Sequence, residues 1–287
     1  MPELADISYS GRRTIAAVTD YYKFLTKLYL KDSQVIYPPA TGWPSIVNAS
    51  LNVRVSFGKS EEVLSLLAHL PYIRSPSNFT DEAEGAPGCR FADWQALFAL
   101  LTTPEGLTTV EELRVLTEGD EFSALAPPHT IGLTCGGREN PIMVLDTKLG
   151  IIHWEDCPPS IEQGNYDKTV EYEPPEDEDD SDDEVPEEEV EWRQSAPAFA
   201  IKDFFAILKD QFKKLHWAPI SQHTVWSADF SVRPDTEGIV AMLQDIYREH
   251  GWPDLTRYRK AECLEAVRSA MRVRYSSSVD PRDNQAA

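Results

Sequence analysis

The residues of this sequence that could perform chemistry lie closest together at His153 and Cys157, where an imidazole and a thiol could act as base and nucleophile. The apolar residues before His153 predict a strand. At about 3.3 Å per residue, four steps along a strand separate the imidazole and the thiol by roughly 13 Å. Pro158 and Pro159 then suit an exit from the strand. We therefore predict no thiol-catalysed reaction here.

A second candidate is Gly58-Lys59-Ser60, which resembles the end of a phosphate-binding loop. Leu51–Phe57 alternates apolar and polar residues and predicts a strand before it, and a helix is predicted over 61–70 after it. A phosphate-binding loop needs an earlier glycine at the position that Val53 occupies. The sequence therefore favours Ser60 as a helix N-cap over a nucleotide site.

Metal-binding spacings are missing from the six histidines and four cysteines, which form no Cys-x-x-Cys, His-x-x-x-His or His-Glu-x-x-His pattern. His216 and His223 lie on either side of Pro219, in a predicted loop. We expect structural histidines, no metal and no cofactor.

The strongest compositional feature is an acidic run over 171–191, with fourteen Asp or Glu residues and no Lys or Arg, within a chain of net charge −21. Such a run repels itself and buries nothing, so we predict a disordered insertion over 172–191. It could dock a basic protein partner, carry a phosphate on Ser181, or be only a solvated spacer. Nucleic acid is disfavoured, because no basic surface is evident. The candidate docking residues are Glu176, Asp177, Glu178, Asp179, Asp180, Asp182, Asp183 and Glu184.

Two tryptophans bracket this run, Trp154 before it and Trp192 within two residues of its end. Tryptophan is enriched at binding surfaces, so both are candidates for a partner-binding face. The alternative is core packing, since each ring covers a large apolar area. For Trp43, Trp94 and Trp252 we expect core packing.

Composition places the chain among intracellular globular proteins. It has 287 residues, of which 41% are hydrophobic and 26% charged, with no apolar stretch long enough to span a membrane. The first ten residues lack the apolar core of a secretory signal, and the four cysteines are widely spaced, as in reduced proteins. We expect a cytoplasmic location, with the nucleus left open, and no membrane association.

The predicted fold class is α+β, with a mixed or antiparallel sheet packed by several amphipathic helices. The clearest local prediction is a hairpin, in which apolar 142–145 turns through 146–150 into 151–154. Hydrophobic periodicity predicts helices over 12–30, 92–101, 108–114, 195–215, 235–250 (capped by Asp235) and 252–274, and a strand over 224–226. We expect one domain in two parts, 1–171 and 192–275, and a flexible tail over 276–287. We expect Ile142, Val144 and Ile151 to pack on Phe204, Phe205 and Leu208 across the insertion.

The hairpin of 140–156 and the helix that begins near Ala198-Phe199 resemble the SUKH superfamily, which contains fungal cell-wall-assembly regulators and bacterial toxin-immunity proteins. Typical members carry Ser-Phe where this chain has Ala198-Phe199. The resemblance covers about 130–212 and implies an α+β interaction domain without a known catalytic centre.

Two functions follow as hypotheses. The first is a non-enzymatic regulatory or scaffold protein that acts through protein contacts, in fungal cell-wall or signalling regulation. The second is an enzyme or accessory factor of fungal small-molecule biosynthesis, with a pocket lined by Tyr and Trp. The oligomeric state is open.

Overall fold

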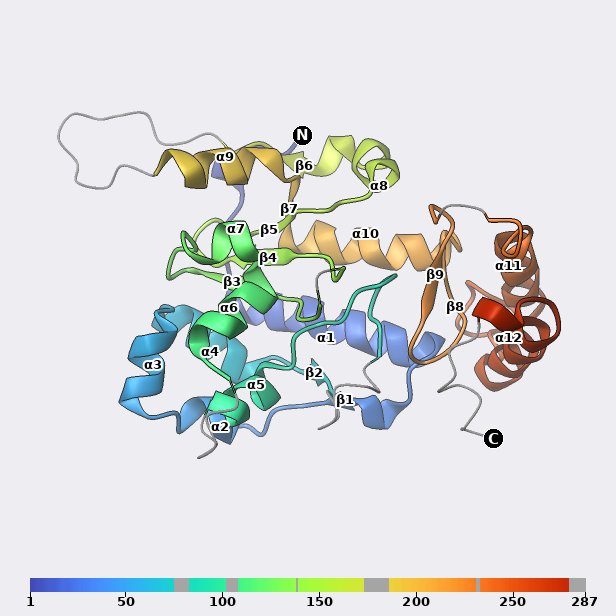
Figure 1. The fold of residues 1–287 in the computed structure, drawn as a ribbon, viewed down its shortest axis with the longest axis horizontal. Helices are drawn as coiled ribbons and strands as arrows, with labels where there is room; N and C mark the ends of the chain where they lie inside the picture. The colour runs from blue at the N-terminus through green and yellow to red at the C-terminus, as the bar shows by residue number, and fades with distance from the viewer. Residues whose placement is uncertain (75–82, 102–107, 138, 173–185, 231–232, 279–287) are drawn as a thin grey trace.

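Two amphipathic helices, α1 (Gly11–Leu28) and α10 (Ile201–Lys213), lie side by side in the computed structural model and form one layer of the fold (Figure 1). The structure describes residues 1–74, 83–101, 108–137, 139–172, 186–230 and 233–278. Helix α1 begins at Ser10, whose hydroxyl accepts a hydrogen bond from the Arg13 amide, and buries its apolar stripe against α10. The predicted helix over 12–30 is confirmed and ends two residues earlier.

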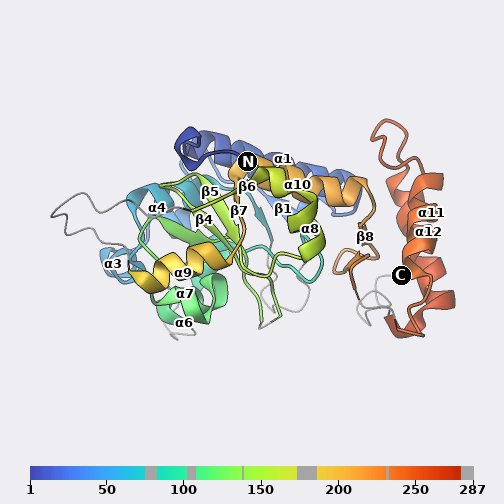
Figure 2. The same ribbon diagram turned by 90° about the horizontal axis from the view of Figure 1, so that it is seen from above.

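A five-stranded antiparallel sheet lies on these two helices (Figures 1 and 2). The strand order is β3-β4-β5-β7-β6. The strands are β3 (Thr130–Gly132), β4 (Met143–Asp146), β5 (Ile151–Trp154), β6 (Thr169–Val170) and β7 (Ala198–Ala200). The predicted hairpin is β4–β5, closed by Gly150 at φ +75° and by the Asp146 carboxylate, which accepts hydrogen bonds from the amides of Lys148 and Leu149 at 2.8 Å. The α+β class is confirmed.

The hairpin packs on α10 through the face opposite to the one we predicted. Residues on the α10 side include Met143, Leu145, Ile152 and Trp154. The three predicted residues, Ile142, Val144 and Ile151, pack in clusters on the other side. All eight residues of β4 and β5 are buried, so both faces of the hairpin are covered. The sequence therefore lacks the alternation of apolar and polar residues that would show which side chains face α10. A shift of one residue in the assumed alternation then places every side chain of the strand on the wrong face of the sheet.

The second face of the sheet is covered by α6 (Val110–Glu118), α7 (Asp120–Ser123) and α9 (Glu187–Ser195), as Figure 2 shows. Gly132 lets α6 approach β3 closely, because a Cβ at this position would lie 2.0 Å from the Thr117 carbonyl oxygen. Helix α8 (Pro159–Gly164) and the 3-10 turn Tyr166–Lys168 lead into β6. The helix predicted over 108–114 corresponds to α6, which begins two residues later and ends four residues later than predicted.

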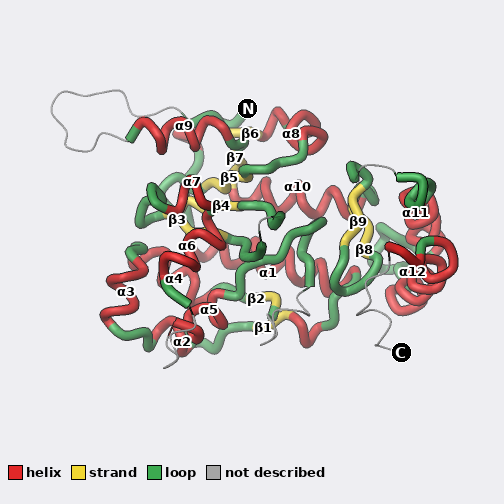
Figure 3. The backbone as a smooth tube through the Cα atoms, viewed as in Figure 1, coloured by secondary structure: helices red, strands yellow, loops and turns green. Residues whose placement is uncertain are grey.

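The N-terminal part of the chain adds a small sheet of β1 (Val35–Ile36) and β2 (Tyr72–Ile73) and four further helices. They are α2 (Pro44–Val47), α3 (Leu51–Phe57), α4 (Glu61–His69) and α5 (Trp94–Leu101), with 3-10 turns at Leu4–Asp6 and Asp32–Gln34. The predicted strand over Leu51–Phe57 is wrong, because the segment is helix α3 (Figure 3). Ser50 caps this helix through the Val53 amide, and Gly58 ends it at φ +67°.

The C-terminal end of the chain adds a hairpin of β8 (Trp217–Pro219) and β9 (Val225–Ser227), followed by α11 (Ile239–Glu249), α12 (Lys260–Arg274) and a 3-10 turn at Ser276–Ser278. The predicted strand at 224–226 is confirmed, but both helices begin later than we predicted. Gly238, not Asp235, precedes α11. A turn over 251–257 delays α12 until Lys260, whose ammonium donates to the carbonyls of Thr26 and Leu30 at the end of α1.

The predicted helix over 195–215 is also corrected at its start. Ala198–Ala200 forms strand β7, which pairs with both β5 and β6, and helix α10 begins only at Ile201. As an interior strand between β5 and β6, this segment has hydrogen bonds on two sides, which outweigh its local helical pattern. Pro197 therefore precedes a strand.

The acidic insertion that we predicted to be disordered over 172–191 is helical at its end, since Glu187–Ser195 forms α9. Three glutamates occupy the first turn of α9 and Arg193 the last, an order that favours a helix through its macrodipole. Residues 173–185 and 279–287 lie outside the described part of the chain. Within that part, none of the helices is long and apolar enough to cross a membrane.

Candidate functional site

The two tryptophans that we predicted as partner-binding residues lie on opposite faces of the sheet. Trp154 faces α10, is 2% exposed and makes an edge-to-face contact with Phe204 at 5.8 Å between centroids. Trp192 belongs to α9, is 6% exposed and stacks on Phe122 of α7 at 3.6 Å. Both rings are therefore packing residues in this structure, and they do not form a common surface.

The exposed side of helix α9 carries glutamates instead. Glu187, Glu188 and Glu191 are exposed on it, while the adjacent positions Glu189, Trp192 and Arg193 are buried. We call the three exposed glutamates the acidic face of α9. The predicted docking residues between Glu176 and Glu184 precede this helix in the sequence and lie outside the described residues, so their role stays a prediction.

A buried arginine holds α9 on the sheet. The Arg193 guanidinium lies 2.8 Å from a Glu189 carboxylate oxygen and 3.0 Å from Oδ2 of Asp146 at the end of β4. It also contacts Nε2 of His153 at 3.1 Å and lies over the Tyr172 ring, 5.1 Å from its centroid. Arg193 thereby joins α9 to β4, to β5 and to Tyr172.

Burial and neighbouring charges shift the pKa values of two groups in this cluster. Burial tends to raise the pKa of Asp146, but the His129 hydrogen bond and the Arg193 charge outweigh it and hold that pKa below its usual range. Burial, with the nearby Arg193 charge, lowers the pKa of His153 to about 3. At neutral pH Asp146 is thus a charged carboxylate, and His153 is a neutral imidazole that accepts a hydrogen bond from the Arg193 guanidinium at Nε2.

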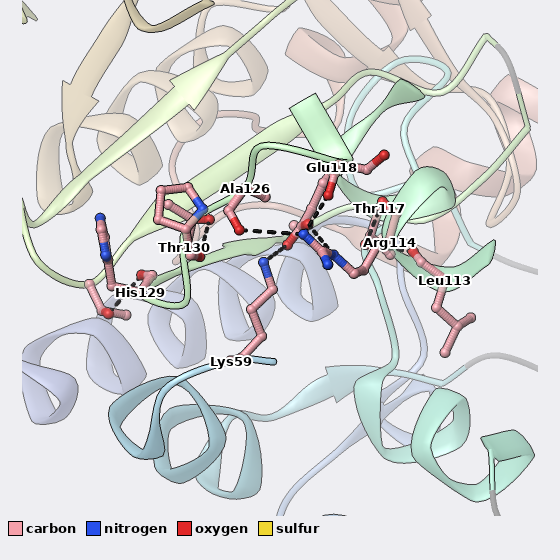
Figure 4. A network of polar contacts seen from close by, with 12 residues as sticks. Lys59, Leu113, Arg114, Thr117, Glu118, Ala126, His129 and Thr130 are labelled. Carbon is pink, nitrogen blue, oxygen red and sulfur yellow. Dashed lines mark hydrogen bonds and ion pairs between the residues drawn. The ribbon is translucent and has the colours of Figure 1, made fainter. Parts of the chain in front are cut away.

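A second buried ion pair explains the Gly58-Lys59-Ser60 segment (Figure 4). The Lys59 ammonium lies 2.6 Å from a Glu118 carboxylate oxygen, and both side chains have no exposed surface. Burial lowers the pKa of Lys59, opposed by the Glu118 charge. Arg114 approaches the other Glu118 oxygen at 3.6 Å and donates to the carbonyls of Ser123 and Ala126.

The local roles of this segment are therefore structural. Gly58 ends α3, Lys59 ties the loop to α6, and Ser60 caps α4 by accepting from the Val63 amide. The predicted capping role of Ser60 is confirmed. Because Lys59 points into the protein and is paired, its ammonium is not presented to a phosphate.

The Cys157 thiol is unsuited to nucleophilic chemistry at neutral pH. Burial, reinforced by the Glu162 charge, raises its pKa to about 12, so the thiolate is scarce. His153 is fully buried in the Arg193 cluster. Among the residues that the structure describes, no group of three or more His, Cys, Asp or Glu side chains could hold a metal ion.

Two surface grooves offer binding space. The first, of about 830 Å³, lies between α3, α6 and α7 and includes Val53, Val110, Glu111, Val115 and Asp120 in its lining. The second, of about 530 Å³, lies between the N-terminal segment, α1 and the start of α10. Neither is lined by Tyr or Trp, which the small-molecule hypothesis requires.

Comparison of the chain with protein-family models, with curated proteins and with solved structures found no match. The resemblance of 130–212 to the SUKH superfamily therefore stays a prediction.

Sequence reasoning missed the residues that organise this site, namely Arg193, Asp146 and the Lys59–Glu118 pair. One indication was present, because Glu189 and Arg193 are four residues apart on a helix, a spacing that forms ion pairs. The partner Asp146 lies far away in the sequence, and no local pattern reveals it.

Proposed function

We propose that this protein acts without catalysis, as a regulatory or scaffold protein that binds a basic protein partner through the acidic face of α9 and the acidic run before it. The carrying observation is that Glu187, Glu188 and Glu191 project from a helix whose inner side is fixed by Arg193. A fixed array of carboxylates attracts cationic surfaces without paying to order its own backbone. The SUKH resemblance is the reason for placing this role in fungal cell-wall or signalling regulation.

The chemistry of the described residues supports binding over catalysis. The buried charges at Arg193 and Lys59 are paired within the protein. The neutral His153 and the protonated Cys157 supply no activated pair.

The proposal is tested by affinity purification with mass spectrometry on the intact chain and on two triple variants. The first carries Glu187→Gln, Glu188→Gln and Glu191→Gln. The second is a control with the same change in net charge, Glu237→Gln, Asp245→Asn and Glu249→Gln, around α11 at the other end of the molecule (Figure 1). We expect a basic protein to be retained by the intact chain and the control and lost from the first variant. Equal retention by both variants would contradict the role of α9.

A further inference from the structure

Helix α3 exposes apolar side chains that the described residues leave uncovered. Leu51, Val53, Val55 and Phe57 alternate along the segment, but on a helix only Val53 and Phe57 turn towards the protein, one turn apart. Leu51 is 75% exposed and Val55 is 70% exposed, also one turn apart. Two large apolar residues stacked on the outer side of a short helix form a continuous apolar strip.

This strip borders the groove between α3, α6 and α7. Asn52 and Ser56, the neighbours of Leu51 and Val55, line that groove. Its apolar lining is formed by Val53, Leu101, Val110, Val115 and Ala124. Helices α3 and α6 both contribute residues to its lining, and a groove between helices suits an amphipathic helix as ligand.

The polar lining of the groove favours a cationic occupant. Glu111 and Asp120 are exposed carboxylates in the lining. Among the described residues of the lining, Arg114 is the one cation, and it is already engaged by Glu118 and by the carbonyls of Ser123 and Ala126.

The groove is also next to the acidic face of α9. Helix α7, which supplies Asp120, is tied to α9 by the stacked rings of Phe122 and Trp192. The two features therefore lie along one edge of the molecule (Figure 2).

We propose that this groove and the strip of Leu51 and Val55 dock an amphipathic helix of the partner, with apolar side chains on one face and Lys or Arg beside them. This inference rests on the proposed function, because it assigns the docking site of the same basic partner. The two features then contribute differently to binding. The acidic face of α9 accelerates association, whereas contacts in the groove, made only after docking, slow dissociation.

The test uses two synthetic peptides of about 18 residues, long enough to follow five helical turns. The first places Leu at helical spacing on one face and Lys on the other, and the second has the same composition in scrambled order. Binding is followed by methyl NMR of the intact chain labelled at Leu and Val. We expect the first peptide to shift the methyl signals of Leu51, Val53, Val55 and Val110. The signal of Val273, which is 83% exposed on α12, should stay in place.

Variants then separate this inference from the proposed function. Leu51→Ser with Val55→Ser should raise the Kd of the first peptide by about tenfold or more, and Val273→Ser should leave it unchanged. If the first peptide binds but shifts no groove methyl, or if the Leu51 and Val55 change leaves its Kd unaltered, the groove is not the docking site and the proposed function still stands. If the groove variant weakens binding while the α9 triple variant associates as fast as the intact chain, the role of α9 fails and the groove stands. Failure of the first peptide to bind overturns the docking proposal. If a variant misfolds, the methyl shifts that the first peptide causes in the intact chain still show whether it binds in the groove.

Discussion

Replacing Arg193 with Met removes the charge that fixes α9 while keeping much of the apolar length of the side chain. The Asp146 carboxylate, which has no exposed surface, then keeps the amides of Lys148 and Leu149 and the His129 ring, 3.4 Å away, but loses its guanidinium partner. Breaking a buried ion pair by removing one partner costs about 3–5 kcal/mol, because the remaining charge stays buried and uncompensated. We expect the free energy of unfolding at about pH 7 to fall by that amount.

The cost should depend on pH with a definite sign. In the wild type the folded-state pKa of Asp146 is lowered, so its contribution is fully present above the unfolded pKa of about 4 and is lost as the pH falls through the folded pKa. Without Arg193, burial favours the protonated acid and penalises the charged form. The difference between the wild type and Arg193→Met should therefore be largest near pH 7 and narrow towards about pH 4.

The assay is urea unfolding followed by circular dichroism at about pH 7 and about pH 4.5, with amide hydrogen exchange to report on α9. The control is Arg268→Met, which breaks an exposed ion pair with Glu265 and should cost no more than about 1 kcal/mol. If Arg193→Met costs no more than this control, or if the difference widens at acid pH, the anchoring role is refuted.

Three further changes test other parts of the account. Phe205→Ala should cost about 3–5 kcal/mol in urea unfolding, since the ring is buried between α10 and α1, and a cost below about 1 kcal/mol would place it at the surface. Gly132→Ala should lower the melting temperature sharply, because the added Cβ meets the Thr117 carbonyl. Gly137→Ala, which has nothing within 4 Å, should not lower it, and equal effects would contradict the close packing of α6 on β3. Replacing residues 173–185 with a short Gly/Ser linker should leave the melting temperature within about 3 °C, and a larger loss would show that the acidic run stabilises the fold.

The sequence predicted the elements whose apolar pattern has one interpretation and failed where the pattern had two. Helix α1 and the β4–β5 hairpin were recognisable from spacing and turn residues. For α3, the apolar residues at 51, 53, 55 and 57 fit a strand by alternation, but Val53 and Phe57 also fit a helix. The residues that decide for the helix are at its ends, where Ser50 is the N-cap and Gly58 the stop.

The candidate site was less predictable because its residues meet through tertiary contacts. The acidic composition of 171–191 predicts a negatively charged surface, which α9 carries, but it also predicts disorder. The last part of the run is instead helical, because Arg193 and Trp192 pack α9 against the sheet and α7. Trp154 and Trp192 lie on either side of the same acidic run in the sequence, and the sheet separates them in the fold. Sequence proximity cannot tell which face of a sheet a residue occupies when both faces are buried.

The most direct test of the central claim is the association rate constant of the recovered basic partner, measured by stopped flow over a range of salt concentrations. We expect the intact chain to associate faster as salt is lowered, because screening acts over about 8 Å at physiological ionic strength, while the dissociation rate stays nearly constant. The variant with Glu187→Gln, Glu188→Gln and Glu191→Gln should associate more slowly at low salt and converge with the intact chain at high salt. If the variant associates as fast as the intact chain at every salt concentration, the acidic face of α9 does not guide the partner and the proposed function is wrong.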